Sequence, residues 1–187
     1  MVATERDRAS LASVRAAYPH VRFVETSRGR AHQMNTGARA AAGTWLMFLH
    51  ADTHLPAQWR TAIAEAERAP DVSIGCFRFA LDSRSFWARA IEAGVRLRVA
   101  VFDLPYGDQA LFVRRAAFVD AGGYAEIPLM EDVDLVRRFR RLGRLYRSPH
   151  PAMTSARKWE REGWIRQSAR NLWLIVRYFA GVPPASL

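Results

Sequence analysis

Short apolar runs alternate with longer amphipathic segments along this chain. Apolar runs predict strands at residues 21–24, 44–49, 72–81, 109–113 and 145–146. Segments with helical periodicity or rich in alanine predict helices at residues 10–17, 31–42, 56–70, 86–101, 132–142 and 164–179. The helix at residues 10–17 has Ser10 as its expected N-cap. Because strands and helices alternate for most of the length, the pattern predicts a layered α/β fold.

The run at residues 44–49 is short and continuously apolar. Such a run is typical of a strand that is buried on both faces, with a neighbour on each edge and helices above and below, as in parallel sheets. We therefore expect parallel strands flanked by helices.

Composition limits the possible fold classes and partners only in part. The chain has 187 residues, half of them apolar, which suits one packed domain. Its single cysteine, Cys76, excludes a disulfide framework and a cysteine-rich metal cluster, and its polar first ten residues show no signal peptide, so we expect a cytoplasmic protein. The formal charge of +10 suits nucleic acid, anionic lipid or a phosphate-bearing substrate, or reflects an Ala- and Arg-rich composition alone. The arginines do not cluster with aromatic residues in a nucleic-acid-binding motif, so we expect no nucleic-acid partner.

Acidic residues at two places in the chain are candidates for chemistry. Asp52 follows the apolar run at residues 44–49, and ligands of open α/β sheets bind beyond the carboxyl ends of strands. A carboxylate there can hold a divalent cation that also contacts a diphosphate, or it can simply cap a turn. Glu131, Asp132 and Asp134 crowd the start of a predicted helix, where they either cap it or supply a general base.

Glycines mark a third candidate region. Gly107 precedes Asp108 and Gln109, and a Gly122-Gly123-Tyr124 turn follows further along the chain. Glycine permits close approach of the backbone to a ligand, although a plain turn between two elements needs the same residues.

These motifs together resemble family 2 glycosyltransferases. The resemblance rests on Gly29 to Ala38, on Leu49 to Thr53, and on the later segments in the family's order. Those later segments are Gly107-Asp108-Gln109, Gly122-Gly123-Tyr124, Met130 to Leu135 and Arg157-Lys158-Trp159. The match runs from about residue 21 to the C-terminus and is most similar to a bacterial branch of arsenosugar-biosynthesis-type glycosyltransferases.

The resemblance implies a GT-A-like (Rossmann-like) α/β fold with a mixed, mainly parallel sheet flanked by helices. It also implies a nucleoside-diphosphate sugar donor, an unknown acceptor, Mn²⁺ or Mg²⁺, and inversion in one displacement. It implies that Asp132 is the base with Glu131 beside it, and that Asp52 binds the metal. The donor-binding residues that it implies are Arg30, Gln33, Asn35, His50, Asp52, Arg157 and Lys158. Those implied for the acceptor are Gly107, Asp108, Gln109 and Trp159.

The sequence departs from the family at two places. His50 replaces the first acid of the family's metal-binding motif, which removes one carboxylate. The family's first two strands, which hold the nucleotide, are expected to be missing, so the fold would be N-terminally incomplete. An exposed sheet edge would favour a homodimer. A catalytically inactive scaffold or interaction module is therefore the alternative to an active transferase.

The C-terminal segment is predicted to be an amphipathic helix whose apolar face needs a partner. We expect residues 1–160 to form the catalytic domain and residues 161–187 an amphipathic helix and tail. Ile165, Ala169, Leu172, Ile175 or Val176, and Phe179 share one face, and Arg166, Arg170 and Arg177 another. The apolar stretch is too short to span a bilayer. It can dock peripherally on the inner face of a membrane, on the protein's own core or on a second subunit.

Overall fold

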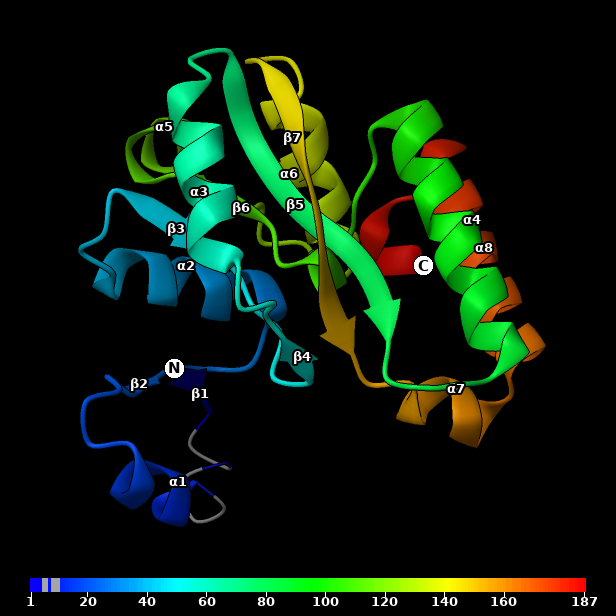
Figure 1. The fold of residues 1–187 in the computed structure, drawn as a ribbon, viewed down its shortest axis with the longest axis horizontal. Helices are drawn as coiled ribbons and strands as arrows, with labels where there is room; N and C mark the ends of the chain where they lie inside the picture. Colours follow the sequence, from blue (N-terminus) through cyan, green and yellow to red (C-terminus); the bar gives the residue numbers. More distant parts are fainter. Residues whose placement is uncertain (5–6, 8–10) are drawn as a thin grey trace.

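The computed structural model describes residues 1–4, 7 and 11–187, and it confirms the predicted α/β architecture with a mixed sheet flanked by helices (Figure 1). The strands are β1 (Val2–Ala3), β2 (Val24–Glu25), β3 (Trp45–Met47), β4 (Thr53–His54), β5 (Val72–Leu81), β6 (Phe112–Arg114) and β7 (Arg144–Thr154). The helices are α1 (Ala12–Ala17), α2 (Arg30–Ala40), α3 (Trp59–Arg68), α4 (Phe86–Phe102), α5 (Arg115–Asp120), α6 (Glu131–Phe139), α7 (Arg157–Glu162) and α8 (Trp164–Phe179). The N-cap predicted at Ser10 lies outside the described residues.

Five strands form the main sheet in the order β3-β6-β5-β7-β4. Its centre is the parallel ladder between β5 and β7, while the β3–β6, β5–β6 and β4–β7 pairs are antiparallel. One apolar cluster joins the sheet to α2, α5 and α6, and a second joins it to α3. Helices therefore cover both faces, as the apolar character of the strands requires.

Strand β7 is much longer than the predicted two-residue strand at 145–146. The prediction ended the strand before Ser148 and Pro149, and proline has no N–H to donate to a ladder. The structure accommodates them in an irregular register: Cys76 pairs with Arg147, whereas Arg78 pairs with Pro151. The extra residues bulge out of the ladder, and Arg78 Nε donates a 3.1 Å hydrogen bond to the Pro149 carbonyl.

Strand β3 confirms one part of its prediction and contradicts another. Leu46 belongs to one apolar cluster while Trp45 and Met47 pack against the other, so the strand contacts apolar side chains on both faces. The prediction of parallel neighbours on both edges is wrong for the described residues. In the part of the chain that the structure describes, β3 pairs only with β6, in antiparallel register, and lies at the edge of the sheet.

Among the described residues, the strands β1 and β4 and the α-helices α5 and α7 were not predicted. The two-residue strand β1 pairs in parallel with β2 in a small separate sheet. Helix α2 packs on it so closely that a Cβ at Gly37 would lie 2.8 Å from Val2 Cγ2. Strand β6 begins only at Phe112, because Gly107–Gln109 forms a 3₁₀ turn instead of the predicted start of a strand.

Candidate active site

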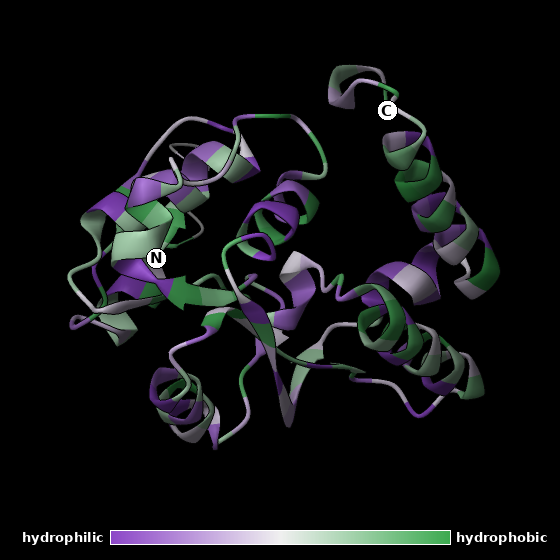
Figure 2. Ribbon diagram, turned by 90° about the horizontal axis from the view of Figure 1, so that it is seen from above, coloured by the Kyte–Doolittle hydropathy of each residue, from purple (hydrophilic) through white to green (hydrophobic). Residues whose placement is uncertain are grey.

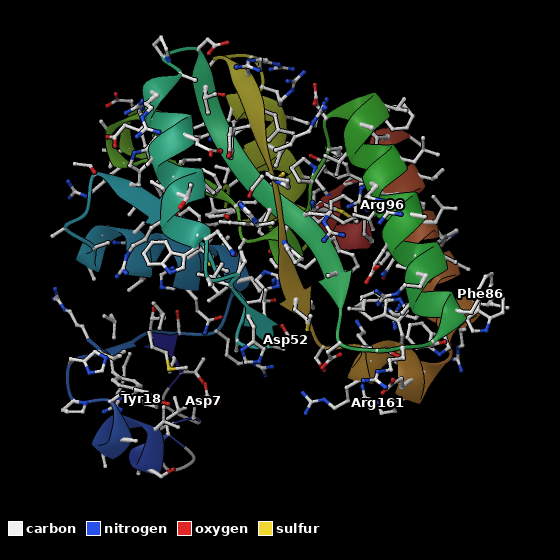
Figure 3. The ribbon with its side chains drawn as sticks, in the orientation of Figure 1. Asp7, Tyr18, Asp52, Phe86, Arg96 and Arg161 are labelled. Carbon is white, nitrogen blue, oxygen red and sulfur yellow. The ribbon has the colours of Figure 1, made fainter. Side chains whose placement is uncertain are left out.

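Four segments that are far apart in the sequence meet near the end of β3. They are the loop after β3, the 3₁₀ turn Gly107–Gln109, and the N-termini of α2 and α6. The loop after β3 brings His50 and Asp52, and Figure 3 shows Asp52 beside β4. The meeting point lies beyond the carboxyl end of a strand, where α/β sheets bind ligands.

The carboxylate of Asp132 is fixed by two backbone donors. The Gly107 N–H donates a 2.7 Å hydrogen bond to Oδ2, and the Val133 N–H a 2.8 Å bond to Oδ1. The first links the 3₁₀ turn to the first turn of α6, where the helix dipole favours negative charge. Met130, just before this helix, has a left-handed backbone with φ of 67°, a strained conformation for a side chain of its size. A carboxylate has about four acceptor positions, so both oxygens of Asp132 retain capacity to accept a proton.

Arg30 connects the two other polar groups of the site. Its Nε lies 3.1 Å from Glu131 Oε1, and its Nη2 donates to His50 Nε2 at 3.1 Å. Because arginine has no acceptor, His50 accepts this bond through an unprotonated nitrogen. Burial, followed by the Arg30 charge, lowers the pKa of His50, which agrees with a neutral ring. Burial raises the pKa of Glu131, which is 3% exposed and whose Oε2 has no hydrogen-bond partner among the described residues.

Asp108 lies in the same turn with an unsatisfied carboxyl oxygen. Its Oδ1 is inaccessible to solvent and has no hydrogen-bond partner among the described residues. Burial raises its pKa to about 6, against the opposing effect of the nearby Arg98 charge. The Asp108 carbonyl accepts a 3.2 Å bond from Thr154 Oγ1 at the end of β7, which ties the turn to the sheet. A buried carboxyl group with an elevated pKa, beside other acids, is typical of functional sites.

Asp52 is exposed, and its backbone joins it to the segment before α7. The Asp52 carbonyl accepts a 3.0 Å bond from the Ser155 N–H. Arg157 and Lys158 follow as the first residues of α7, and both are exposed. The backbone of the predicted metal ligand is therefore hydrogen-bonded to a residue that lies two positions before the first of the predicted diphosphate-binding cations.

Comparison with known proteins identifies the family of the chain. Residues 3–125 match the family Glycosyl transferase family 2. The chain belongs to this family. The match begins well before residue 21, where the resemblance was expected to start, and it ends before Glu131 and Asp132. The sequence matches no curated protein.

Solved structures show the same fold. The chain is similar to the mannosyltransferase PcManGT from Pyrobaculum calidifontis in complex with GDP-Man and Mn²⁺, with 20% identity and a TM-score of 0.56 over 81% of this chain and 46% of that one. It is also similar to a mycobacterial protein, with 16% identity and a TM-score of 0.51 over 82% of this chain and 53% of that one. The chain thus spans about half the length of these structures. The GT-A-like fold of this family 2 glycosyltransferase is confirmed, and its assignment to the arsenosugar branch stays a prediction.

The donor atoms of the site fit a metal shared with substrate. Among the described residues, no three His, Cys, Asp or Glu side chains form a group that could hold an ion alone. The exposed carboxylate of Asp52 supplies oxygen donors, the type that Mg²⁺ and Mn²⁺ prefer. Mg²⁺ is commonly bound by one or two carboxylates together with substrate phosphates. The residues present therefore suit an ion completed by a diphosphate.

Several predicted site residues of this glycosyltransferase have structural contacts. Asn35 donates to the Tyr124 carbonyl at 2.9 Å and accepts from the Tyr124 N–H at 2.8 Å, so both ends of its amide hold the glycine turn. Gln109 is 2% exposed and donates to the Phe77 carbonyl at 2.9 Å. The half-buried Trp159 packs edge-on against Phe79, with ring centroids 6.4 Å apart. The predicted role of Asn35 in donor binding, and those of Gln109 and Trp159 in acceptor binding, stay predictions. Gln33 lies half-buried on α2, and its role in donor binding stays a prediction.

Sequence reasoning missed two arginines that shape the site. The Arg98 guanidinium lies 3.4 Å from the centroid of the Tyr106 ring, and its Nη2 bonds Gln109 Oε1 at 3.4 Å. Arg138 donates to the carbonyls of Ala121 and Gly123 at 2.8 and 2.6 Å. Both lie within amphipathic helices rich in arginine, so no sequence signal distinguished them.

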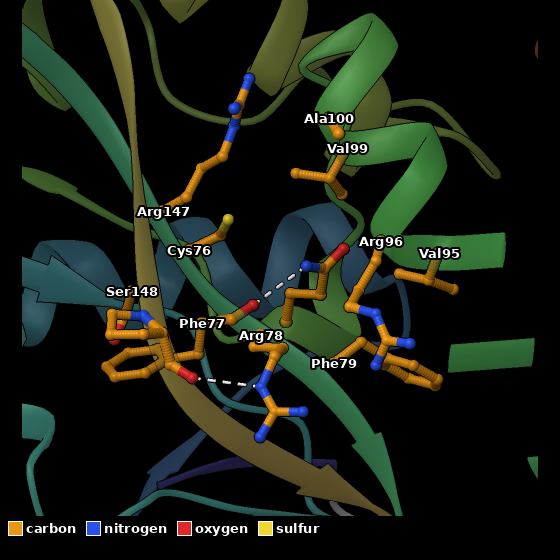
Figure 4. A pocket seen from close by; sticks show the side chains of 12 residues that line it. Cys76, Phe77, Arg78, Phe79, Val95, Arg96, Val99, Ala100, Arg147 and Ser148 are labelled. Carbon is orange, nitrogen blue, oxygen red and sulfur yellow. Dashed lines mark hydrogen bonds between the residues drawn. The ribbon is translucent and has the colours of Figure 1, made fainter. Parts of the chain in front are cut away.

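A cavity of about 220 Å³ adjoins the site turn through Gln109 (Figure 4). It lies between β5, β7 and α4, with Cys76 and Val99 among its apolar lining, and Arg78, Arg96 and Arg147 supply positive charge. Burial raises the pKa of Cys76 to about 12, so its thiol stays protonated.

Proposed function

We propose that this family 2 glycosyltransferase moves a sugar from a nucleoside-diphosphate sugar to an acceptor hydroxyl, with inversion and with the help of a divalent metal. The observation that carries this proposal is the hydrogen bond between Gly107 N and Asp132 Oδ2, which joins two motifs of the site. Glu131, Asp108 and His50 surround it. The ligands in the structure of the similar mannosyltransferase, GDP-Man and Mn²⁺, support the same class of donor and ion.

In this proposal, Asp132 acts as the base. It accepts the proton of the acceptor hydroxyl as that oxygen attacks C1 of the sugar, and the bond from C1 to the diphosphate oxygen breaks on the opposite face. One displacement inverts C1 and needs no covalent intermediate. The two backbone donors hold the carboxylate in place, which contributes orientation.

The departing diphosphate carries the charge that the rest of the site must stabilise. Arg157 and Lys158 are exposed cations at the start of α7 and would approach its oxygens. Arg30 is already engaged by Glu131 and His50, so we assign it to shaping the site around the acids. A bound Mn²⁺ or Mg²⁺, held by Asp52, would neutralise diphosphate charge.

Binding measurements on the full chain test the metal-dependent part. We expect calorimetry to show UDP or GDP binding that strengthens with Mn²⁺. Asp52→Asn should reduce this Mn²⁺-dependent affinity by about tenfold or more, since an opposite charge near the ion is lost. The exposed Asp120→Asn, at the end of α5, is the matched control and should bind like the wild type. Equal affinity of the Asp52 variant and the wild type would contradict the assignment.

A panel of nucleotide sugars tests the reaction. Mn²⁺-dependent release of nucleoside diphosphate that Asp132→Asn abolishes would support the transferase. Tight nucleotide binding without release or transfer for any donor would instead favour the inactive scaffold.

A further inference from the structure

Helices α4 and α8 expose apolar side chains along their outer faces. The two helices pack together and form one edge of the molecule (Figure 1), and both are largely apolar in Figure 2. On α4 the exposed large apolar residues are Phe86, Trp87, Leu97, Val101 and Phe102. On α8 they are Ile165, Leu172, Trp173, Val176 and Phe179. We call these ten residues the outer face. Figure 3 shows Phe86 directed away from the sheet.

The spacing of these residues is helical, so each helix presents a stripe. Phe86, Leu97 and Val101 fall on one side of α4, and Ile165, Leu172 and Val176 on one side of α8. Phe86 is 77% exposed, and Leu172 is 64% exposed. A soluble monomer rarely exposes contiguous apolar patches of more than a few hundred Å² without a function.

Helix α8 turns most of its apolar stripe away from the protein's own core. Gln167 is 2% exposed on its inner side and donates to Asn171 Oδ1 at 2.9 Å. Ile175 is the one buried large apolar residue within Trp164–Phe179, all of which the structure describes. Helix α8 therefore packs on the protein's own core through Ile175 and Tyr178, while Ile165, Leu172, Val176 and Phe179 stay exposed, so the core leaves most of the apolar stripe uncovered.

Charge on the two helices indicates what covers the outer face. Helix α8 contains three arginines and no acidic residue. The only acid in α4 is Glu92, which is 3% exposed and engaged by Arg89 and by the Leu81 N–H, both at 2.8 Å. The Arg177 guanidinium lies 4.4 Å from the ring centroid of Trp173, at the border between charge and apolar surface. Apolar stripes bordered by arginine and tryptophan suit the boundary between headgroups and acyl chains.

We propose that the outer face of α4 and α8 docks on the surface of an anionic lipid bilayer. A second copy of this chain would bring the arginines that border the apolar stripe near one another, and the acid beside them, Glu162, already shares a pocket with Arg166 and Arg170 of its own copy, which disfavours self-association through this face. Anionic headgroups supply the missing charge, and acyl chains cover the apolar side chains. Along the described residues, no helix is long and apolar enough to cross a membrane, so the contact is peripheral. The proposal does not depend on the transferase assignment, because none of the ten residues belongs to the site.

Vesicle binding by the full chain tests this directly. We expect it to co-sediment with vesicles of phosphatidylcholine containing about one third phosphatidylglycerol, weakly with phosphatidylcholine alone, and less as salt rises. Leu172→Glu should reduce binding to the anionic vesicles by about tenfold or more, because it removes an apolar contact and adds a repelled charge.

A matched substitution distinguishes docking through the outer face from the non-specific attraction between a basic protein and an anionic vesicle. Leu142 is also 64% exposed but follows α6, outside the outer face. Leu142→Glu changes net charge equally and should bind vesicles like the wild type, with thermal midpoints confirming that both variants fold. Similar losses in both variants, or no binding of the wild type to anionic vesicles, would overturn the proposal. So would a wild-type dimer that Leu172→Glu dissociates, since the face would then belong to a second copy.

Discussion

The Gly107 N–H and Asp132 Oδ2 are joined by a 2.7 Å hydrogen bond across 25 residues of sequence. It fixes the distance between the 3₁₀ turn and the N-terminus of α6, and leaves no room for a side chain at Gly107. A Cβ there would lie 2.8 Å from His50 Nε2 and 3.3 Å from Asp132 Oδ2.

Gly107→Ala should therefore displace His50 or Asp132. We expect turnover to fall by about 10- to 100-fold, because misplacement of a reacting group by about 1 Å has effects of that size. Steady-state kinetics check this. Gly94→Ala is the control, since a Cβ at Gly94 meets nothing within 4 Å and alanine favours helix α4. A fully active Gly107→Ala enzyme would show that this close approach does not matter.

Asp132→Asn should lower turnover by about two to four orders of magnitude, because the amide cannot take the acceptor's proton. Donor affinity should hardly change, since the side chain keeps its shape. Asp134→Asn provides the comparison. Asp134 accepts a 2.8 Å bond from Arg138 Nε and should affect turnover only a few-fold. If the two variants lose activity equally, Asp132 is not the base.

Removing Arg30 should lower the free energy of unfolding, because Glu131 would remain as a buried carboxylate without a cation. Arg30→Ala leaves a 3% exposed carboxylate without its cation, and we expect a loss of about 1–3 kcal/mol in unfolding free energy, reduced from a fully buried pair because Arg30 is 48% exposed. Urea denaturation measures it. Glu131→Gln in the same chain should restore much of the loss. Arg39→Ala, on the exposed side of α2, should change stability by no more than about 0.5 kcal/mol.

Asp108 predicts a pH dependence of stability. Burial raises its pKa from 3.8 to about 6, so the folded state binds this proton more tightly than the unfolded state. Its contribution favours folding at low pH and is lost as pH rises from about 4 through about 6. Asp108→Asn imitates the neutral form and should raise the thermal midpoint at about pH 7.5 but hardly at about pH 4.

Thermal scans in a chelating buffer measure this difference, with Asp120→Asn reporting the effect of removing a surface charge. If the thermal midpoints of Asp108→Asn and the wild type differ by the same amount at all pH values, the raised pKa of Asp108 is contradicted.

The sequence by itself determined the α/β alternation, the strand at 72–81, the helix at 164–179 and the family. These features depend on local periodicity and on motifs whose residues are close along the chain. The same evidence placed His50, Asp52, Asp108 and Asp132 among the candidates.

Only the tertiary structure decided which of these groups meet and which way the helices face. Asn35 and Gln109 are polar residues in motifs, yet their partners are backbone groups 89 and 32 residues away. Periodicity showed that α8 has an apolar stripe, but a stripe looks the same whether it is turned toward a core or toward solvent. Its orientation depends on Gln167 and Ile175 packing inward, and contacts between distant segments leave no local pattern in the sequence.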